Sequence, residues 1–156
     1  MLRELSGIGI DPRYLPVNAS ALAHLARFLP EGGTGHAVVL LDVGHRTTEL
    51  CVLVDGSPLM SRTIDWGSAD VDAVLHDAYR FGPGELQEYK HRAVALHGFD
   101  DDPEMAPVVE MARKAAAPLL AMLRTTLIAF EDERGVEVEE VYLCGGGSRL
   151  RGMAPF

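Results

Sequence analysis

Two apolar runs separated by a short polar turn form the clearest pattern in the chain, and they lie at 37–43 and 50–54. Runs of this length that are rich in Val and Leu favour buried strands over helices. The dipeptide Asp55-Gly56 follows the second run, and Asp-Gly between apolar runs is typical of a hairpin turn. A third strand is expected from Pro58 to Ile64. The pattern therefore predicts a three-stranded antiparallel meander within residues 36–66.

Apolar residues at helical spacing flank this meander on both sides. Before the meander we expect a short strand over 13–17 and a helix that starts at Asn18 or Ser20 and runs to about Phe28. After the meander we expect Ser68 to cap a second helix, because serine is a preferred N-cap residue. Strands and helices thus alternate, which indicates an α/β domain.

The second half of the chain predicts two more helical regions and a closing strand. An amphipathic helix is expected over 85–97, with Lys90 away from its apolar face. A long helical region is expected over 104–134, with a kink or a break at Pro118. A strand over Val138 to Cys144 then leads directly into three glycines.

Composition narrows the classes of function that the chain can have. The 156 residues carry a net charge of -9, and their Lys and Arg residues are scattered singly, so we expect no nucleic-acid partner. No apolar run reaches the roughly 18 residues that a membrane span needs. Cys51 and Cys144 lie in predicted buried strands and match no metal or redox spacing. Such cysteines are typical of reduced structural thiols in the cytosol.

The turn between the first two predicted strands carries the most suggestive chemistry. Asp42 ends a buried strand, Gly44 follows two residues later, and Thr47 and Thr48 open the next strand. Glycine lets backbone N–H groups approach an anion, threonine hydroxyls donate to phosphate oxygens, and an aspartate can hold Mg²⁺ through water. An alternative interpretation remains open, in which Gly44 only satisfies the turn geometry and the threonines are ordinary strand formers.

The three glycines after the closing strand form a second candidate site. Gly145, Gly146 and Gly147 precede Ser148, so a strand is followed by flexible backbone and by the expected start of a helix. Such an arrangement lets the backbone lie flat against a ligand and lets a helix N-terminus face an anion. We expect close packing at the middle glycine, so that Gly146→Val would cost several kcal/mol.

These motifs resemble those of the actin, hexokinase and FtsA superfamily, and they occur in superfamily order over nearly the whole chain. In detail, the stretches 42–44, 53–67, 85–92 and 143–153 look most like PilM and GspL. Those are the cytoplasmic actin-like proteins of type IV pilus assembly and type II secretion. The resemblance implies an α/β fold of the actin-like (ribonuclease H-like) class, with a mixed sheet whose antiparallel meander is flanked by helices.

The resemblance also implies a division of the chain and identifies it as the second half of an actin-like molecule. The expected parts are the end of a preceding subdomain (1–17), a connecting helix (18–35), the phosphate-hairpin meander (36–66), a helical region (67–136), and the adenosine-motif strand with the start of a last helix (137–156).

A nucleotide site is a further implication of the resemblance. Asp42 would hold Mg²⁺, and Gly44, Thr47 and Thr48 would contact phosphate. The residues that would contact adenosine are Gln87, Lys90, Gly145, Gly146, Gly147 and Ser148. For Lys90 the alternative is a solvated lysine on a surface helix. We expect ATP with Mg²⁺ in the full-length protein and no cofactor for this fragment alone, because the other half supplies the first phosphate hairpin.

The implied function is that of a scaffold beneath the bacterial inner membrane, which joins membrane-anchored assembly proteins to a motor ATPase. His45 and Arg46 stand where ATP-binding members have small residues, which argues against hydrolysis, although Arg46 could instead pair with phosphate. A homodimer through the exposed face of the cleft is a further expectation. The alternatives are an FtsA-like division protein and an ATPase or sugar-kinase-like enzyme of the superfamily.

Overall fold

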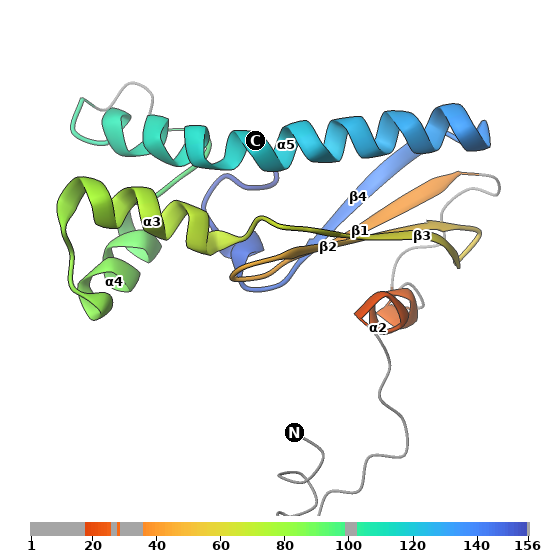
Figure 1. Cartoon of the computed structure of the whole chain (residues 1–156), viewed down its shortest axis with the longest axis horizontal. Helices are drawn as coiled ribbons and strands as arrows, with labels where there is room; N and C mark the ends of the chain where they lie inside the picture. Colours follow the sequence, from red (N-terminus) through yellow and green to blue (C-terminus); the bar gives the residue numbers. More distant parts are fainter. Residues whose placement is uncertain (1–17, 26–27, 29–35, 99–102, 156) are drawn as a thin grey trace, which may run out of the picture.

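The computed structural model describes residues 18–25, 28, 36–98 and 103–155, and its centre is a four-stranded mixed sheet (Figure 1). The strands are β1 (Ala37–Val43), β2 (Thr48–Val54), β3 (Ser57–Ile64) and β4 (Val138–Cys144), in the spatial order β3-β2-β1-β4. The first three strands pair antiparallel, and β4 pairs parallel with β1. The predicted meander and the predicted closing strand are both confirmed.

The turn between β2 and β3 has the geometry that its sequence predicts. Asp55 and Gly56 both adopt positive φ angles, of 48° and 72°. Two-residue hairpin turns of this kind match the right-handed twist of the flanking strands, and Asp-Gly is a favoured pair for them. The local sequence therefore determines where β2 ends and where the chain reverses.

Both faces of β1 are buried, which explains why its sequence is a continuous apolar run. On one face, Val39 and Leu41 pack in the main core with residues of the long helix α5 (Ala106–Arg134). On the other face, Leu40 packs with Leu22 of helix α2 (Asn18–Leu25). Figure 1 shows the same arrangement, with α5 along one side of the sheet and α2 on the opposite side.

Two of the predictions before the meander concern residues that the structure does not describe. The predicted strand over 13–17 lies outside the described residues, and so do residues 26–27 of the expected first helix.

The helix after the meander, α3 (Ser68–Tyr79), begins one residue earlier than expected. Its N-cap is Gly67, and the carboxylate of Asp70 accepts a hydrogen bond of 2.9 Å from the N–H of Gly67. A side chain at Gly67 would collide with the backbone of His45. The prediction of Ser68 as the N-cap was wrong because this close approach requires glycine at the cap.

Helix α4 (Pro83–Ala93) is shorter than the predicted helix over 85–97. The chain leaves the helix at Val94, and Leu96 donates a backbone hydrogen bond of 2.7 Å to the carbonyl of Arg151. Leu96 is buried through this tertiary contact and does not lie on a helical face. The periodic pattern extended the helix too far because a distant segment pairs with its end.

Helix α5 runs over 29 residues without interruption, although Pro118 lies inside it. Of the kink or break predicted at Pro118, the break does not occur. Pro118 is exposed, so water can solvate the carbonyl group whose helical hydrogen bond the proline removes. The neighbouring carbonyl of Ala115 also accepts a hydrogen bond of 2.8 Å from the indole of Trp66, which anchors the helix to the end of the meander. In the part of the chain that the structure describes, neither α5 nor any other helix combines the length and the apolar character that a bilayer crossing needs.

Candidate functional site

The turn between β1 and β2 is closed by its own backbone and requires glycine. The N–H of Gly44 donates a hydrogen bond of 3.0 Å to the carbonyl of Thr47. A Cβ atom at Gly44 would lie 2.6 Å from that carbonyl oxygen. Asp42 lies half-buried at the end of β1, where it pairs in register with Glu49 of β2 and Cys144 of β4.

The same turn is fastened to the N-terminus of α3. The N–H of Ser68 donates to the carbonyl of Gly44 at 3.0 Å, and the N–H of Ala69 donates to the carbonyl of His45 at 2.7 Å. Free N–H groups at a helix N-terminus are what makes it a site for anions. Here the first N–H groups of α3 serve the hairpin, so the N-terminus of α3 fixes the turn and is not open to a phosphate.

The two threonines of the candidate phosphate site have different surroundings. Thr48 is fully buried, and its hydroxyl donates a hydrogen bond of 2.9 Å to the carbonyl of Trp66. This hydroxyl therefore connects β2 to the segment before α3. Thr47 is exposed at the turn. Of the two predicted phosphate donors, Thr47 is the one that a ligand can reach in this arrangement.

The glycines after β4 pack against the end of β1, and each has a different environment. Gly145 has a φ of +84°, and a Cβ atom there would meet the carboxylate of Asp42 and the carbonyl of Val43. A Cβ atom at Gly147 would lie 2.5 Å from a methyl group of Val43. A Cβ atom at Gly146 would have nothing within 4 Å. The expected clash at Gly146 was wrong: the close packing belongs to its two neighbours, and Gly146 faces open space.

Ser148 takes part in the turn that follows these glycines. Its hydroxyl donates a hydrogen bond of 2.8 Å to the carbonyl of Gly145. The segment is a single 3₁₀ turn, η2 (Gly147–Arg149), where the sequence predicted the start of a longer helix. A helix of three residues has too few aligned peptide groups for a sizeable dipole, so the expected anion site at a helix N-terminus is not formed by this segment.

Asp42 affects the chemistry of a neighbouring thiol on β4. Burial raises the pKa of Cys144, and the negative charge of Asp42 raises that pKa further. Burial alone raises the pKa of Cys51. Neither Cys51 nor Cys144 forms a disulfide bond, and Cys51 is buried in the core between the sheet and α2. The prediction of thiols in strands is confirmed for both, although Cys144 is only half-buried.

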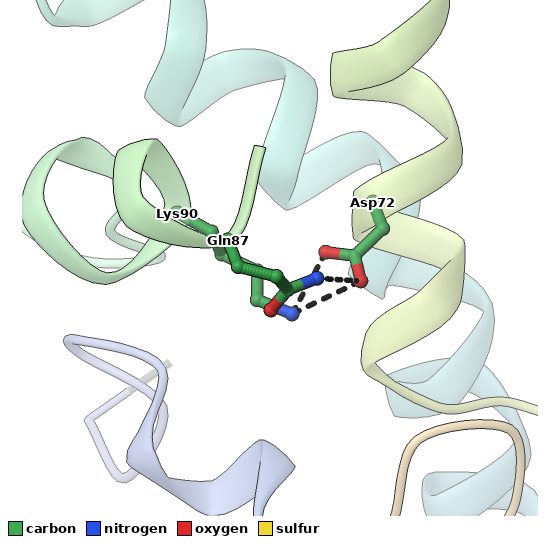
Figure 2. A network of polar contacts seen from close by, with 3 residues as sticks. All are labelled: Asp72, Gln87 and Lys90. Atoms are coloured by element: carbon green, nitrogen blue, oxygen red, sulfur yellow. Dashed lines mark hydrogen bonds and ion pairs between the residues drawn. The ribbon is translucent and has the colours of Figure 1, made fainter. Parts of the chain in front are cut away.

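Lys90 lies in a buried ion pair, so the alternative of a solvated lysine was wrong. Its ammonium group lies 2.8 Å from Oδ1 and 3.0 Å from Oδ2 of Asp72 on α3. The amide of Gln87, one turn earlier on α4, donates a hydrogen bond of 3.0 Å to Oδ2 of the same carboxylate. Figure 2 shows these three side chains, with Lys90 and Gln87 approaching Asp72 from α4.

Asp72 is the functional residue that the sequence pattern did not single out. It lies near the start of a helix, where acidic residues are common because they interact favourably with the helix dipole. The signal that could have identified it is its place between Val71 and Leu75, two residues of the buried face of α3. A charged residue within an apolar stripe needs a partner, and the partner lies 18 positions away at Lys90.

A small hollow joins Lys90 to the glycines after β4. Its volume is about 40 Å³, and the residues that line it include Lys90, Gly146, Gly147, Ser68 and Arg149. This volume exceeds the roughly 10–15 Å³ that one water molecule requires and is far below the roughly 300–1,000 Å³ of a typical ligand pocket. The hollow is thus too small to hold a ligand by itself and can form only part of the wall of a larger site. Asp42 and Thr47 do not line it.

Among the described residues, no cluster of three or more His, Cys, Asp or Glu side chains could hold a metal ion. Mg²⁺ commonly binds to one or two carboxylates together with water and substrate phosphates. Asp42 fits the role of one such carboxylate. That role stays a prediction.

Comparison with known sequences connects this geometry to a family. A sequence profile described as "Type IV pilus assembly protein PilM" matches residues 5–156, which is nearly the whole chain. The chain belongs to the PilM family. Among curated protein sequences, no match was found.

Solved structures support the same assignment for this PilM-family chain. It is similar to a chain of the "PilM-PilN type IV pilus biogenesis complex", with 26% identity and a TM-score of 0.77 over 99% of its length and 42% of that chain. It also resembles MreB5 of Spiroplasma citri bound to AMPPNP, with 14% identity and a TM-score of 0.67, covering 96% of this chain and 53% of that one. An archaeal actin homologue, Ta0583 in complex with ADP, gives 24% identity and a TM-score of 0.56, covering 85% of this chain and 44% of that one.

These likenesses confirm the predicted actin-like α/β fold. The chain spans about half the length of the solved structures that it matches, or somewhat less. The residues predicted to contact nucleotide fall into two groups on this fold. Asp42, Gly44 and Thr47 lie at the hairpin, where Gly145 packs next to Asp42 and Gly147 next to Gly44, whereas Lys90, Gly146 and Gly147 line the hollow.

Proposed function

We propose that this chain is part of a cytoplasmic, actin-like scaffold of the type IV pilus machinery at the bacterial inner membrane, where it joins membrane-anchored assembly proteins to a motor ATPase. The family match over residues 5–156 is the observation that carries the proposal. That match favours the pilus system over type II secretion, which the resemblance to GspL had left open.

A membrane-anchored protein is the first partner that the proposal requires. The similar chain of known structure was solved in a complex of PilM with PilN. We propose that the partner binds this chain through a short cytoplasmic segment. The motor ATPase would use another face, and self-association of the chain stays a separate prediction.

Calorimetric titration with a peptide of the partner tests this role. The full-length gene product would be mixed with a synthetic peptide of the cytoplasmic segment of the membrane-anchored pilus protein encoded by the same organism. We expect saturable binding by calorimetry, and none with a scrambled peptide of the same composition. Equal binding of both peptides, or of neither, would reject the scaffold role as stated.

We also propose that the chain supplies one wall of a nucleotide cleft. Lys90, Gly146 and Gly147 would face the adenosine, and Asp42 would hold Mg²⁺ through water near the phosphates. The convergence of Lys90 and the glycines on one hollow supports this proposal, and neighbours of the same fold were solved with AMPPNP and with ADP. His45 and Arg46 are exposed at the tip of the hairpin, and their bulk near a γ-phosphate argues for binding without rapid hydrolysis.

Gly146 offers a sharp test of the cleft. A Cβ atom there would have no neighbouring atom within 4 Å, so we expect Gly146→Val to leave the fold intact and to fill the space in front of the hollow. We expect Mg-ATP to bind the full-length protein and to bind this variant at least about tenfold more weakly. The matched control is Gly84→Val, a glycine on α4 that also has open space around it and does not line the hollow. Equal affinity in both variants would argue against the proposed wall.

A further inference from the structure

The pair formed by Asp72 and Lys90 differs from the other ion pairs of the described residues. The side chains of Asp72 and Lys90 are 11% and 7% exposed, whereas Lys114 and Glu110 on α5, for example, are 75% and 58% exposed. Taking two charges out of water is costly, and a well-packed apolar pair of similar volume is often at least as stable. Stability is therefore a weak reason for this chain to bury a carboxylate and an ammonium group at this place.

The geometry suggests a different role for the carboxylate. Lys90 has a flexible side chain with four carbons, yet its ammonium group is fixed at the wall of the hollow because both oxygens of Asp72 lie within 3.0 Å. The same carboxylate accepts the hydrogen bond of Gln87. One residue of α3 thus orients both of the α4 side chains that the sequence predicts to contact adenosine, and Lys90 is the one that lines the hollow.

The pairing also decides what kind of group Lys90 can bind. An ammonium group has three N–H donors. One of them is hydrogen-bonded to Oδ2 of Asp72 at 3.0 Å, and Oδ1 lies 2.8 Å from the same nitrogen as an ion-pair contact without a hydrogen bond. The positive charge is already compensated, so the attraction of Lys90 for a phosphate is reduced. The donors that Asp72 does not engage suit a neutral acceptor, such as a sugar hydroxyl or a ring nitrogen.

Helix α3 connects this pair to the hairpin. Its first residues are bonded to the carbonyls of Gly44 and His45, and Asp72 follows one turn later on the same helix. A single rigid element therefore places Lys90 relative to the hairpin, where the phosphates are proposed to lie.

We propose that Asp72 is a positioning residue for the nucleoside part of a bound nucleotide. It holds Lys90 at the hollow as a charge-compensated hydrogen-bond donor to a neutral acceptor of the sugar or the base. This inference rests on the proposed nucleotide cleft and goes beyond it, because it assigns a role to a residue that does not itself line the hollow.

Calorimetric titration of Mg-ATP into the full-length gene product and its variants tests the proposal. We expect Asp72→Asn to weaken binding by about tenfold or more, the loss typical of a misplaced charged donor. In the background of Lys90→Met, the same substitution should have no further effect, because Asp72 acts through Lys90. The matched control is Asp77→Asn, which removes an exposed carboxylate from the same helix and should leave the Kd unchanged.

A second variant keeps the test decisive if Lys90→Met alone does not fold. Asp72→Leu combined with Lys90→Met replaces the buried pair with apolar side chains, a change that usually preserves stability. We expect an unchanged melting temperature together with the same tenfold loss of affinity.

The outcomes separate the two proposals. No binding by the wild-type protein would overturn the nucleotide cleft and this inference with it. Binding by the wild type with an unchanged Kd in Asp72→Asn, or in the apolar double variant, would overturn the positioning role alone. An equal loss on Asp72→Asn with Lys90 present or absent would also overturn it, because Asp72 would then act by another route.

Discussion

At the scale of single residues, the candidate site is shaped by which atoms each glycine touches. Gly145, Gly146 and Gly147 look equivalent in the sequence, yet a Cβ atom would clash at the first and third and would be accommodated at the second. The difference arises because the first and third lie against Asp42 and Val43 of the neighbouring strand. Glycine is required there for packing, whereas at Gly146 it leaves space in front of the hollow.

Replacement of these glycines should therefore affect stability unequally. We expect Gly145→Ala to lower the free energy of unfolding by about 2–4 kcal/mol, because it combines a strained φ of +84° with a clash at β1. Gly146→Ala should change it by less than about 0.5 kcal/mol. Urea denaturation of both variants checks the expectation, and equal losses would contradict it.

Thr48 provides a second prediction at this scale. Thr48→Val keeps the shape of the side chain but leaves the buried carbonyl of Trp66 without its hydroxyl donor. We expect a loss of about 1–3 kcal/mol in the free energy of unfolding. Thr47→Val, at the exposed neighbour, is the control and should stay within about 0.5 kcal/mol of the wild type. A Thr48→Val variant as stable as the control would show that this hydroxyl is dispensable.

The thiol of Cys144 reports on the charge of Asp42. The thiolate is the reactive form, and both burial and Asp42 raise the pKa of Cys144. We therefore expect slow alkylation by iodoacetamide at pH 8. Asp42→Asn should speed it up, because removal of the negative charge lowers the pKa and increases the thiolate fraction. The measurement is the rate of mass addition at Cys144, in a Cys51→Ala background, and an unchanged rate would argue against this electrostatic contact.

At the scale of elements, the helices differ in how far their own sequences determine them. The interruption of α5 predicted at Pro118 does not occur, because its apolar face packs against the sheet and its proline points to solvent. The end of α4 was predicted too late, because the segment after Ala93 pairs with the chain near Arg151. In each case a tertiary contact outweighs the local preference, since helices in proteins draw most of their stability from packing.

Pro118 tests the balance between packing and propensity. We expect Pro118→Ala to raise the free energy of unfolding by about 1–3 kcal/mol, because alanine restores a helical hydrogen bond and fits the helix better. The control on the same helix is Ala121→Gly, at an exposed position, which should lower it by about 1 kcal/mol. Chemical denaturation followed by circular dichroism measures both. A loss of stability in Pro118→Ala would mean that the proline relieves a strain in α5.

At the scale of the whole molecule, the chain carries one of the two walls that the proposed nucleotide cleft needs. It spans 42% of the similar chain in the PilM-PilN complex. The hairpin and the hollow lie on this one body, and the contacts proposed from the other half are not part of it.

Titration of Mg-ATP into the full-length protein and, in parallel, into these 156 residues tests whether the nucleotide needs both walls. Each charge-assisted hydrogen bond to phosphate contributes about 1.5–3 kcal/mol, so the absence of one hairpin should weaken binding by orders of magnitude. We expect micromolar binding to the full-length protein and none measurable to the chain alone. Equal affinities would place the whole site on this half.

The sequence by itself determined the meander, the closing strand and the family, because these depend on patterns that are local. The apolar runs of the strands, the Asp55-Gly56 turn and the glycine-flanked motifs each depend on residues that are close together in the sequence. Tertiary structure alone decided which polar groups are available to a ligand. Thr48 is bonded to Trp66, 18 positions away, and Lys90 is paired with Asp72, also 18 positions away. A buried polar group must find a partner wherever the fold provides one, and no periodic pattern in the sequence names that partner.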